Sequence, residues 1–340
     1  MKTRFGTPKC HERKSCVACS LRGPVREPTC HSVLLVLPFL LRRLGLAVAT
    51  IFLVVTVGFV LGRLTGAPGA LLLPDNASAA DVDALNARLG FDRPVIVQYL
   101  DFLGGLFVGD FGDSYRRHES ALGLVLERVP ATVELAFWAF IAGFALALIA
   151  ALAIQLTGSR LLRAIVGWSG AVRQSVPDFF FALLLVLVFS VLLGALPSLG
   201  RTSPASLVLP VITLATGQFV MYLRLLDAAL SEQAEQDYVR TAFAQGHSRA
   251  SILLTQMLPN ALAPVLGMAG LNLGGLLGGT VVVEVVFAWP GLGSLLTDAV
   301  SQRDFPIVQA GLLFVALMFV LVNTLVDVLV SRIDTRTAHS

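Results

Sequence analysis

The segment that decides the fold is residues 231–264, SEQAEQDYVRTAFAQGHSRASILLTQMLPNALAP, a polar stretch between two strongly apolar runs. In its first half, side chains recur at the 3.6-residue spacing of one helix face. These are Tyr238, Val239, Ala242, Phe243 and Gln245. The pattern predicts an amphipathic helix that extends from the apolar run before it.

The middle of this segment carries the signals that end one helix and begin another. Gly246 is placed to stop the first helix in a left-handed turn, and Ser248 to cap a second helix over residues 249–257. Leu258 and Pro259 are expected to end that second helix. Two short helices around a glycine predict a rigid, protruding elbow. A hairpin lying in the lipid headgroups is the alternative that the pattern leaves open.

The composition around the segment is that of an integral membrane protein. Hydrophobic residues make up 56% of the 340-residue chain, charged residues only 14%, and the mean hydropathy is +0.79. Six apolar runs are long enough to cross the hydrocarbon layer, which takes about 20 helical residues. They are residues 44–64, 131–156, 165–196, 207–226, 261–287 and 307–330. The expected fold is all-α and polytopic.

The third run is too long for one straight crossing and carries Arg173 and Pro177. We expect its first part to lie at the interface and a kinked span to follow. Arginines concentrate in the segments that flank alternate runs, which the positive-inside tendency assigns to the cytosol together with both termini. They are Arg42, Arg43, Arg160, Arg163, Arg224, Arg240, Arg249, Arg332 and Arg336, against Arg201 and Arg303 in the short loops of the other side.

Four regions follow from these patterns. They are a basic, cysteine-containing cytosolic tail without fixed structure (1–36), a first span with a long outer loop (37–130), a five-helix core (131–335) that carries the elbow at 231–260, and a short cytosolic tail (336–340). The outer loop contains two expected helices, over residues 78–89 with Ser78 as cap and over 93–106 beginning near Pro94.

All cysteines of the chain, Cys10, Cys16, Cys19 and Cys30, lie in the tail. Thiolates at a CxxC step beside His11 and His31 suit zinc or an iron–sulfur cluster. We favour an unstructured tail without metal. A further possibility is that translation begins near Val33 or Val36, so that the tail is not part of the protein.

The chain is not expected to be an enzyme. A phosphate-binding P-loop needs a glycine-rich turn ending in lysine, whereas Lys2, Lys9 and Lys14, the lysines of the chain, all lie in the tail. The histidines outside the tail have no ligand-like spacing. We therefore expect no cofactor on this chain and no nucleic-acid partner.

The elbow also carries a family resemblance. Arg240-Thr241-Ala242, three residues, Gly246, nine residues, then Gln256 to Pro259 resembles the EAA loop of binding-protein-dependent ABC importer permeases. Arg240, Thr241 and Gln256 depart from the general pattern, and the Arg-Thr-Ala version is similar to the oligopeptide/dipeptide (peptide/nickel) branch.

Further segments resemble the same branch in the same order. They are FLLRRL (39–44), the outer-loop stretch LNARLGFDRPVIVQYLDFLGGLFVGDFGDSY, ERVPATVEL (127–135) and EVVFAWPGLGSLLTDAVSQRDFPIVQA (284–310). The resemblance covers nearly everything after residue 37 and implies the type I permease fold.

The resemblance implies a non-catalytic permease of the cytoplasmic membrane that imports peptides or a similar small solute. Implied partners are a second homologous permease, two ATPase subunits that hold ATP and Mg, an extracytoplasmic substrate-binding protein and membrane lipid. The residues implied in ATPase coupling are Arg240, Thr241, Ala242, Gly246, His247, Ser248, Leu258 and Pro259. Dipeptides, oligopeptides, nickel chelates, glutathione and haem are all cargoes of the branch.

Polar residues within the apolar runs ordinarily face the bundle interior or a wet cavity. Glu284, at the start of a segment that resembles a re-entrant region, is the expected gate-lining carboxylate, and Asn272 is a second candidate for the path. The competing interpretation of the whole chain is a self-sufficient secondary carrier or channel, which normally shows an inverted repeat. We find no such repeat in the sequence.

Overall fold

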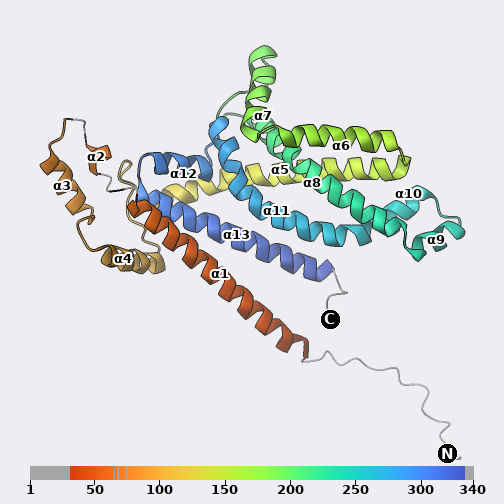
Figure 1. Cartoon of the computed structure of the whole chain (residues 1–340), viewed down its shortest axis with the longest axis horizontal. Helices are drawn as coiled ribbons and strands as arrows, with labels where there is room; N and C mark the ends of the chain where they lie inside the picture. The colour runs from red at the N-terminus through yellow and green to blue at the C-terminus, as the bar shows by residue number, and fades with distance from the viewer. Residues whose placement is uncertain (1–30, 65, 67–68, 74–75, 334–340) are drawn as a thin grey trace, which may run out of the picture. The chain divides into compact units, whose positions relative to one another are not determined.

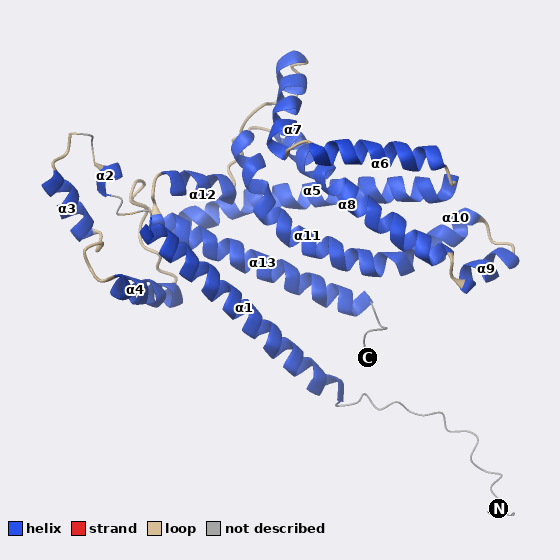
Figure 2. Cartoon of the chain, in the orientation of Figure 1, coloured by secondary structure: helices blue, strands red, loops and turns tan. Residues whose placement is uncertain are grey.

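The computed structural model describes residues 31–64, 66, 69–73 and 76–333, and every regular element within them is helical (Figures 1 and 2). The chain divides into two compact units, residues 1–48 and 49–340. The described part of the first unit is the beginning of helix α1. The second unit holds the other helices and the sites discussed below.

Five long helices are apolar enough to cross a membrane, and a bent pair of helices gives a sixth span if the two are counted together. The long helices are α1 (His31–Leu64), α5 (Ala121–Thr157), α8 (Val208–Ala234), α11 (Leu258–Val286) and α13 (Phe305–Ile333); the bent pair is α6 (Arg160–Ser175) with α7 (Asp178–Leu185) and its π-helical continuation Val186–Leu192. The prediction of six spans in an all-α protein is confirmed if the bent pair counts as one span.

Two helices begin before the apolar runs that predicted them. Helix α1 begins at His31, within the segment expected to be an unstructured tail. Helix α5 begins at Ala121, ten residues before the expected span, because the hydroxyl of Ser120 caps it by accepting from the amide of Gly123. Pro130 lies inside α5. The outer loop is correspondingly shorter than the sequence indicated.

Small residues let the helices of the bundle approach closely. In α5, Ala139, Ala147 and Ala151 are fully buried, and this helix packs along α8. A Cβ added at Gly143 of α5 would lie 2.9 Å from the carbonyl oxygen of Ala215 on α8. Because packing replaces the hydrophobic drive between helices in lipid, such contacts are the main source of cohesion. Helices α11 and α13 approach closely in the same way at Gly270, which faces the side chain of Val326.

The sharp bend of the third span is held by one arginine. Helices α6 and α7 meet at 103°, and the guanidinium of Arg173 donates to the carbonyls of Val176 and Thr213, the hydroxyl of Thr216 and the carboxylate of Asp178. The predicted bend is therefore confirmed. The arginine that interrupts the apolar run is the residue that ties the bend to α8.

The outer loop contains α2 (Gly69–Leu72), α3 (Ala79–Arg88) and α4 (Val95–Val108). Ser78 forms a capping box with Asp81, and Pro94 precedes α4, as predicted. The loop is attached to the turn after α12 (Leu292–Ser301), where the buried carboxylate of Asp304 accepts from the hydroxyl of Ser114 and from the amide of Tyr115. Burial raises the pKa of Tyr115 to about 12.

Candidate functional site: the elbow between α8 and α11

The elbow lies at the end of the bundle opposite α12 (Figure 1). It begins with α9 (Asp237–Ala244), which is separated from α8 by a break at Glu235 and Gln236. The expected continuous extension of the fourth span is therefore wrong. Because α9 is a separate helix, its direction is set by its own packing and not by the axis of α8.

The turn after α9 has the hydrogen bonds of a Schellman motif. The amide of His247 donates to the carbonyl of Ala242 over 3.2 Å, and the amide of Gly246 donates to the carbonyl of Phe243 over 3.0 Å. Gly246 has φ +87°, the left-handed region in which an L-residue is strained. The prediction that Gly246 ends the first helix in a left-handed turn is confirmed.

The second arm of the elbow starts as predicted and ends differently. The hydroxyl of Ser248 accepts from the amide of Ser251 and caps α10 (Arg249–Ile252). A π-helical segment, Leu253–Met257, then leads directly into α11, which begins at Leu258. The expectation that Leu258 and Pro259 end the second helix is wrong. Pro259 is the second residue of α11 and directly follows the π-helical segment, where the hydrogen-bond pattern changes.

The inner face of the elbow is part of the bundle core. Val239, Ala242, Ile252, Leu253 and Met257 are all buried and belong to one cluster with residues of α5, α8 and α11. In α8 the cluster includes Leu226 and Leu230, which are fully buried. Since close-packed side chains transmit displacement with little compression, a push on the elbow must move the helices on which it rests.

The outer face of the elbow is accessible. Every residue from Phe243 to Ala250 is exposed, including Gly246, His247, Ser248 and Arg249. Phe243 leaves 51% of its surface exposed although it is aromatic. Arg240 is also exposed and pairs weakly with Asp237 at 3.6 Å, whereas the hydroxyl of Thr241 donates to a carbonyl of its own helix. The tip thus offers an aromatic group and basic groups on a backbone fixed by caps.

A polar network braces the helix ends beneath the elbow, and sequence reasoning did not find it. The carboxylate of Asp227 on α8 accepts from the guanidinium of Arg163 at 3.1 Å and from the amide of Gln155 at 3.0 Å. Gln155 also donates to the hydroxyl of Ser231. These residues come from α5, α6 and α8. The sequence gives no signal for this network, because only the packing of three helices selects the partners.

Arg249 adds a contact from the elbow itself. A Cβ built on Gly158, the left-handed residue that ends α5, would lie 3.5 Å from the guanidinium nitrogens of Arg249. A cation at a helix C-terminus interacts favourably with the helix dipole. The second arm of the elbow is therefore in direct contact with the end of α5.

Glu284, the carboxylate expected to line a gate, is buried between helices in this structure. Its side chain is 0% exposed. The carboxylate accepts from the hydroxyl of Thr132 on α5 at 2.7 Å and from the amide of Ser294 on α12 at 3.0 Å. Thr132 in turn accepts from the amide of Leu292. Because Gly291 at the N-cap has no side chain, Glu284 and Thr132 supply the caps of α12.

The other candidates are placed as follows. Asn272 lies on α11 and donates to the carbonyl of Met268 in its own helix. The residues of the proposed tail site, Cys10, Cys16, Cys19 and Cys30, lie outside the described residues. Among residues 31–64, 66, 69–73 and 76–333, no group of three or more His, Cys, Asp or Glu side chains has the arrangement of a metal site.

The chain matches two family models. Residues 127–339 match the family of binding-protein-dependent transport system inner membrane components, and residues 36–136 match the N-terminal model of the corresponding membrane components. The first match includes the elbow, and together the two matches leave only the tail and the last residue uncovered.

Similar proteins come from several bacteria. The di/tripeptide transport system permease protein DppB of Pseudomonas aeruginosa is 35% identical, over 89% of this chain and 99% of its own length. The glutathione transport system permease protein GsiC of Escherichia coli is 37% identical, with coverage of 88% and 98%. A chain of the inward-facing MetNI methionine ABC transporter has a TM-score of 0.51 at 20% identity, over 62% of this chain and 96% of its own, and shares the fold.

Proposed function

This chain belongs to the family of binding-protein-dependent transport system inner membrane components, and from that premise we propose that its elbow receives the mechanical input of ATPase subunits held on separate chains. The chain is the permease, the transport component of an ABC importer. One observation carries the proposal. The exposed segment from Phe243 to Ala250 is capped on both sides and rests on a buried base shared with three membrane helices.

The geometry explains how work enters without chemistry on this chain. An ATPase surface that moves against the tip cannot straighten the elbow cheaply, because the Schellman turn at Gly246 and the Ser248 cap fix its two arms. The displacement passes instead to α11, which follows the second arm without a break, and to α5 through Arg249 and Gly158. Rigid-body motion of packed helices around a central path is one established mode of switching between states.

The assembly proposed is two permeases, two ATPase subunits that bind ATP and Mg, and a substrate-binding protein on the outer side. The long outer loop, attached to the α12–α13 turn through Asp304, is the part of this chain proposed to meet the binding protein. From the arginines near the elbow we infer that this end lies in the cytosol. Both termini are therefore proposed to be cytosolic, and the chain is proposed to span the cytoplasmic membrane.

Short peptides are the proposed cargo. The similar permeases are named for di/tripeptide, peptide and glutathione transport, and these share a peptide backbone with charged ends. Asn272 remains our candidate for the path. It lies near exposed glycines of α11, Gly275 and Gly279, whose Cβ positions are open space, and this leaves room for a polar solute beside the helix.

Site-directed crosslinking tests the coupling. In a chain whose four native cysteines are replaced, Ala244→Cys on the tip is expected to crosslink to a co-expressed ATPase subunit, and Ser301→Cys at the opposite end is the matched exposed control. Crosslinking should change with ATP binding. If no ATPase co-purifies in mild detergent and uptake continues without one, the secondary carrier is the correct interpretation.

A further inference from the structure

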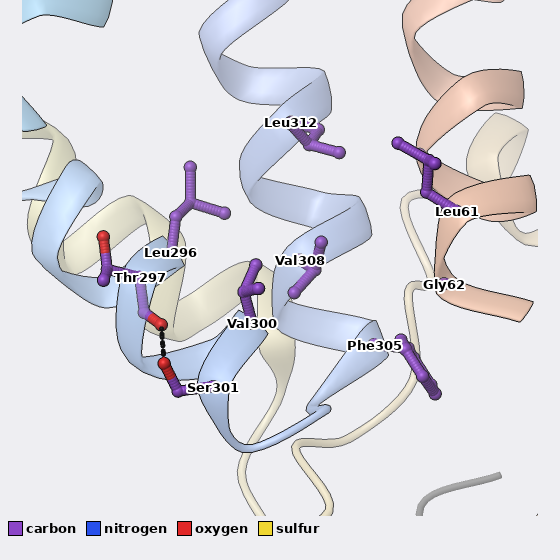
Figure 3. Close-up of a pocket in the computed structure, with 10 residues that line it drawn as sticks. Leu61, Gly62, Leu296, Thr297, Val300, Ser301, Phe305, Val308 and Leu312 are labelled. Atoms are coloured by element: carbon purple, nitrogen blue, oxygen red, sulfur yellow. Dashed lines mark hydrogen bonds between the residues drawn. The ribbon is translucent and has the colours of Figure 1, made fainter. Parts of the chain in front are cut away.

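A groove of about 500 Å³ opens between α1 and the pair α12 and α13 (Figure 3). Its walls are apolar. The lining side chains and glycines used below are Gly58, Gly62, Leu296, Val300, Val308 and Leu312. The two hydroxyls in the wall are already engaged, because Thr297 donates to the carbonyl of Gly293 and Ser301 to that of Thr297, both over 2.9 Å. The groove therefore offers hydrocarbon contact and little hydrogen bonding.

The groove exists because α1 presents two glycines on one face. Gly58 and Gly62 are four residues apart, and Cβ atoms there would lie 2.6 Å from Leu312 and 3.0 Å from Phe305 of α13. The helices touch along this edge, and the groove lies beside the contact. Both helices have the length and hydropathy of membrane spans, so the open side of the groove faces lipid.

The length and the chemistry of the groove suit an acyl chain. From Phe305 to Leu312 the groove follows α13 for about 10 Å at 1.5 Å per residue, which lies within one leaflet of a hydrocarbon core about 30 Å thick. Its apolar walls match a hydrocarbon chain.

A cation lies in the α12–α13 turn at one end of the groove, called the mouth below, between the lining residues Ser301 and Phe305. Arg303 occupies the residue after the C-cap of α12, with φ +53°, and the amides of Arg303 and Asp304 close a Schellman turn onto Val300 and Ala299. Glycine is the usual residue there, since the left-handed region is strained for an L-residue. Within the described part of the chain, the Arg303 guanidinium has no ion pair or hydrogen bond. A Cβ at Gly66 would lie 3.7 Å from its Nη1.

A second guanidinium lies next to the groove. Arg63 follows Gly62 and stacks over Phe91 at 4.0 Å, with the ring of Phe305, a groove residue, at 5.9 Å. Its Nε and Nη1 have no hydrogen-bond partner among the described residues. The nearby carboxylate of Asp304 already accepts from the outer loop. The mouth therefore carries an excess of positive charge.

We propose that this groove binds an anionic phospholipid of the outer leaflet, with one acyl chain between α1 and α13 and the headgroup phosphate at Arg303. The assignment to the outer leaflet rests on the orientation in the proposed function. The bound lipid would fill the wedge between the first span and the α12–α13 pair, which is also the pair that anchors the outer loop.

The test uses the full-length chain, alone and in its complex, in nanodiscs of phosphatidylcholine that contain phosphatidylglycerol with a photoreactive group on one acyl chain. After irradiation, peptide mapping is expected to find the adducts concentrated on residues 58–62 and 296–312. A photoreactive phosphatidylcholine should label these peptides about fivefold less, the effect of one basic side chain near an anionic lipid.

Two pairs of variants make the result specific. Arg303→Gly removes the cation and relieves the left-handed strain, so it should lower the labelling about fivefold without loss of thermal stability. The exposed Arg88 of α3 provides the control, Arg88→Gln. Val308→Trp should fill the groove and abolish labelling by both lipids, whereas Leu321→Trp, on an exposed face of the same helix, should not.

Three outcomes would overturn the proposal. The first is equal labelling by the two lipids, and the second is unchanged labelling in Arg303→Gly. The third is labelling of the isolated chain that disappears in the complex, which would make the groove an interface with the second permease. None of these measurements requires ATP or uptake, so failure of the lipid site and failure of the proposed function are distinguishable.

Discussion

The hydroxyl of Thr132 on α5 donates a hydrogen bond to the carboxylate of Glu284 on α11 over 2.7 Å, and both side chains are buried. The same carboxylate accepts from the amide of Ser294, so a single acidic group joins α5, α11 and the start of α12. In this structure the carboxylate that was expected to line a gate links three helices of the bundle. A structural role and a gating role predict different outcomes when the carboxylate is removed.

Replacing Glu284 with alanine is expected to destabilise the protein. The change leaves the Thr132 hydroxyl and the Ser294 amide without their acceptor, at about 1–3 kcal/mol for each buried group. We expect a lower melting temperature in detergent and less protein in the membrane. Glu235→Ala, at an exposed position after α8, is the matched control. A Glu284→Ala protein of normal stability that fails only in uptake would restore the gate-lining role.

Replacing Gly270 with alanine is expected to loosen the contact of α11 with α13. The added Cβ would overlap the side chain of Val326, and such overpacking costs about 1–3 kcal/mol. Gly275→Ala on the same helix is the matched control, because its Cβ would meet nothing within 4 Å and alanine gains up to about 1 kcal/mol of helix propensity. Thermal unfolding in detergent should shift in opposite directions for the two variants. Equal shifts would refute the packing assignment.

Substitutions at Gly246 are expected to separate backbone strain from the chemistry of the tip. The position has φ +87° and open space around its Cβ, so only the backbone and the partner surface can oppose a side chain. Gly246→Asp is expected to reach the membrane at normal abundance but to uncouple ATP hydrolysis from uptake.

Gly246→Asn separates the effect of charge from that of backbone strain. Asparagine has the shape of aspartate and tolerates the left-handed region, but it adds no charge. It should keep most of the uptake, whereas Gly246→Val should lose it through strain. The assay compares ATPase activity and peptide uptake in proteoliposomes. Normal coupled uptake by Gly246→Asp would count against the coupling role of the elbow.

Tyr115 gives the attachment of the outer loop a pH dependence. Because burial raises the pKa of its hydroxyl to about 12 from an ordinary value of 10, the folded state favours the neutral phenol. Stability from this site is fully present below about pH 10 and is lost as the pH rises through about 12, by about 2–3 kcal/mol in total. The melting temperature of the wild type should therefore fall more steeply between about pH 10 and pH 12 than that of Tyr115→Phe. Parallel curves would show that Tyr115 is not buried in the folded protein.

The predictions that succeeded were local ones. Gly246 and Ser248 act through backbone conformation and a hydrogen bond three residues away, so their neighbours in the sequence were enough to infer the turn and the cap. The same holds for Ser78. The predicted end of the second arm was wrong because the helical path continues through the π-helical segment Leu253–Met257 into α11, with Pro259 near the start of α11.

Two features of the site depend on a partner from elsewhere in the chain, the hydrogen bonds of Glu284 and the ion pair of Asp227. Nothing near Glu284 in the sequence indicates Thr132, which lies 152 residues away, and nothing near Asp227 selects Arg163 over the other arginines. A polar residue in an apolar run signals that some partner is present. Only the packed helices identify it.

By itself, the sequence determined the membrane character of this protein, its apolar helices and the position of the elbow, because hydropathy, helix periodicity and capping depend on residues a few positions apart. The tertiary structure alone decided that the buried carboxylate of Glu284 links three helices, that α11 continues the elbow without a break, and that Arg303 lies in the turn at one end of an apolar groove. The physical reason is that these features depend on which side chains meet across helices. In lipid, close approach at small residues such as Gly58, Gly143 and Gly270 sets those meetings.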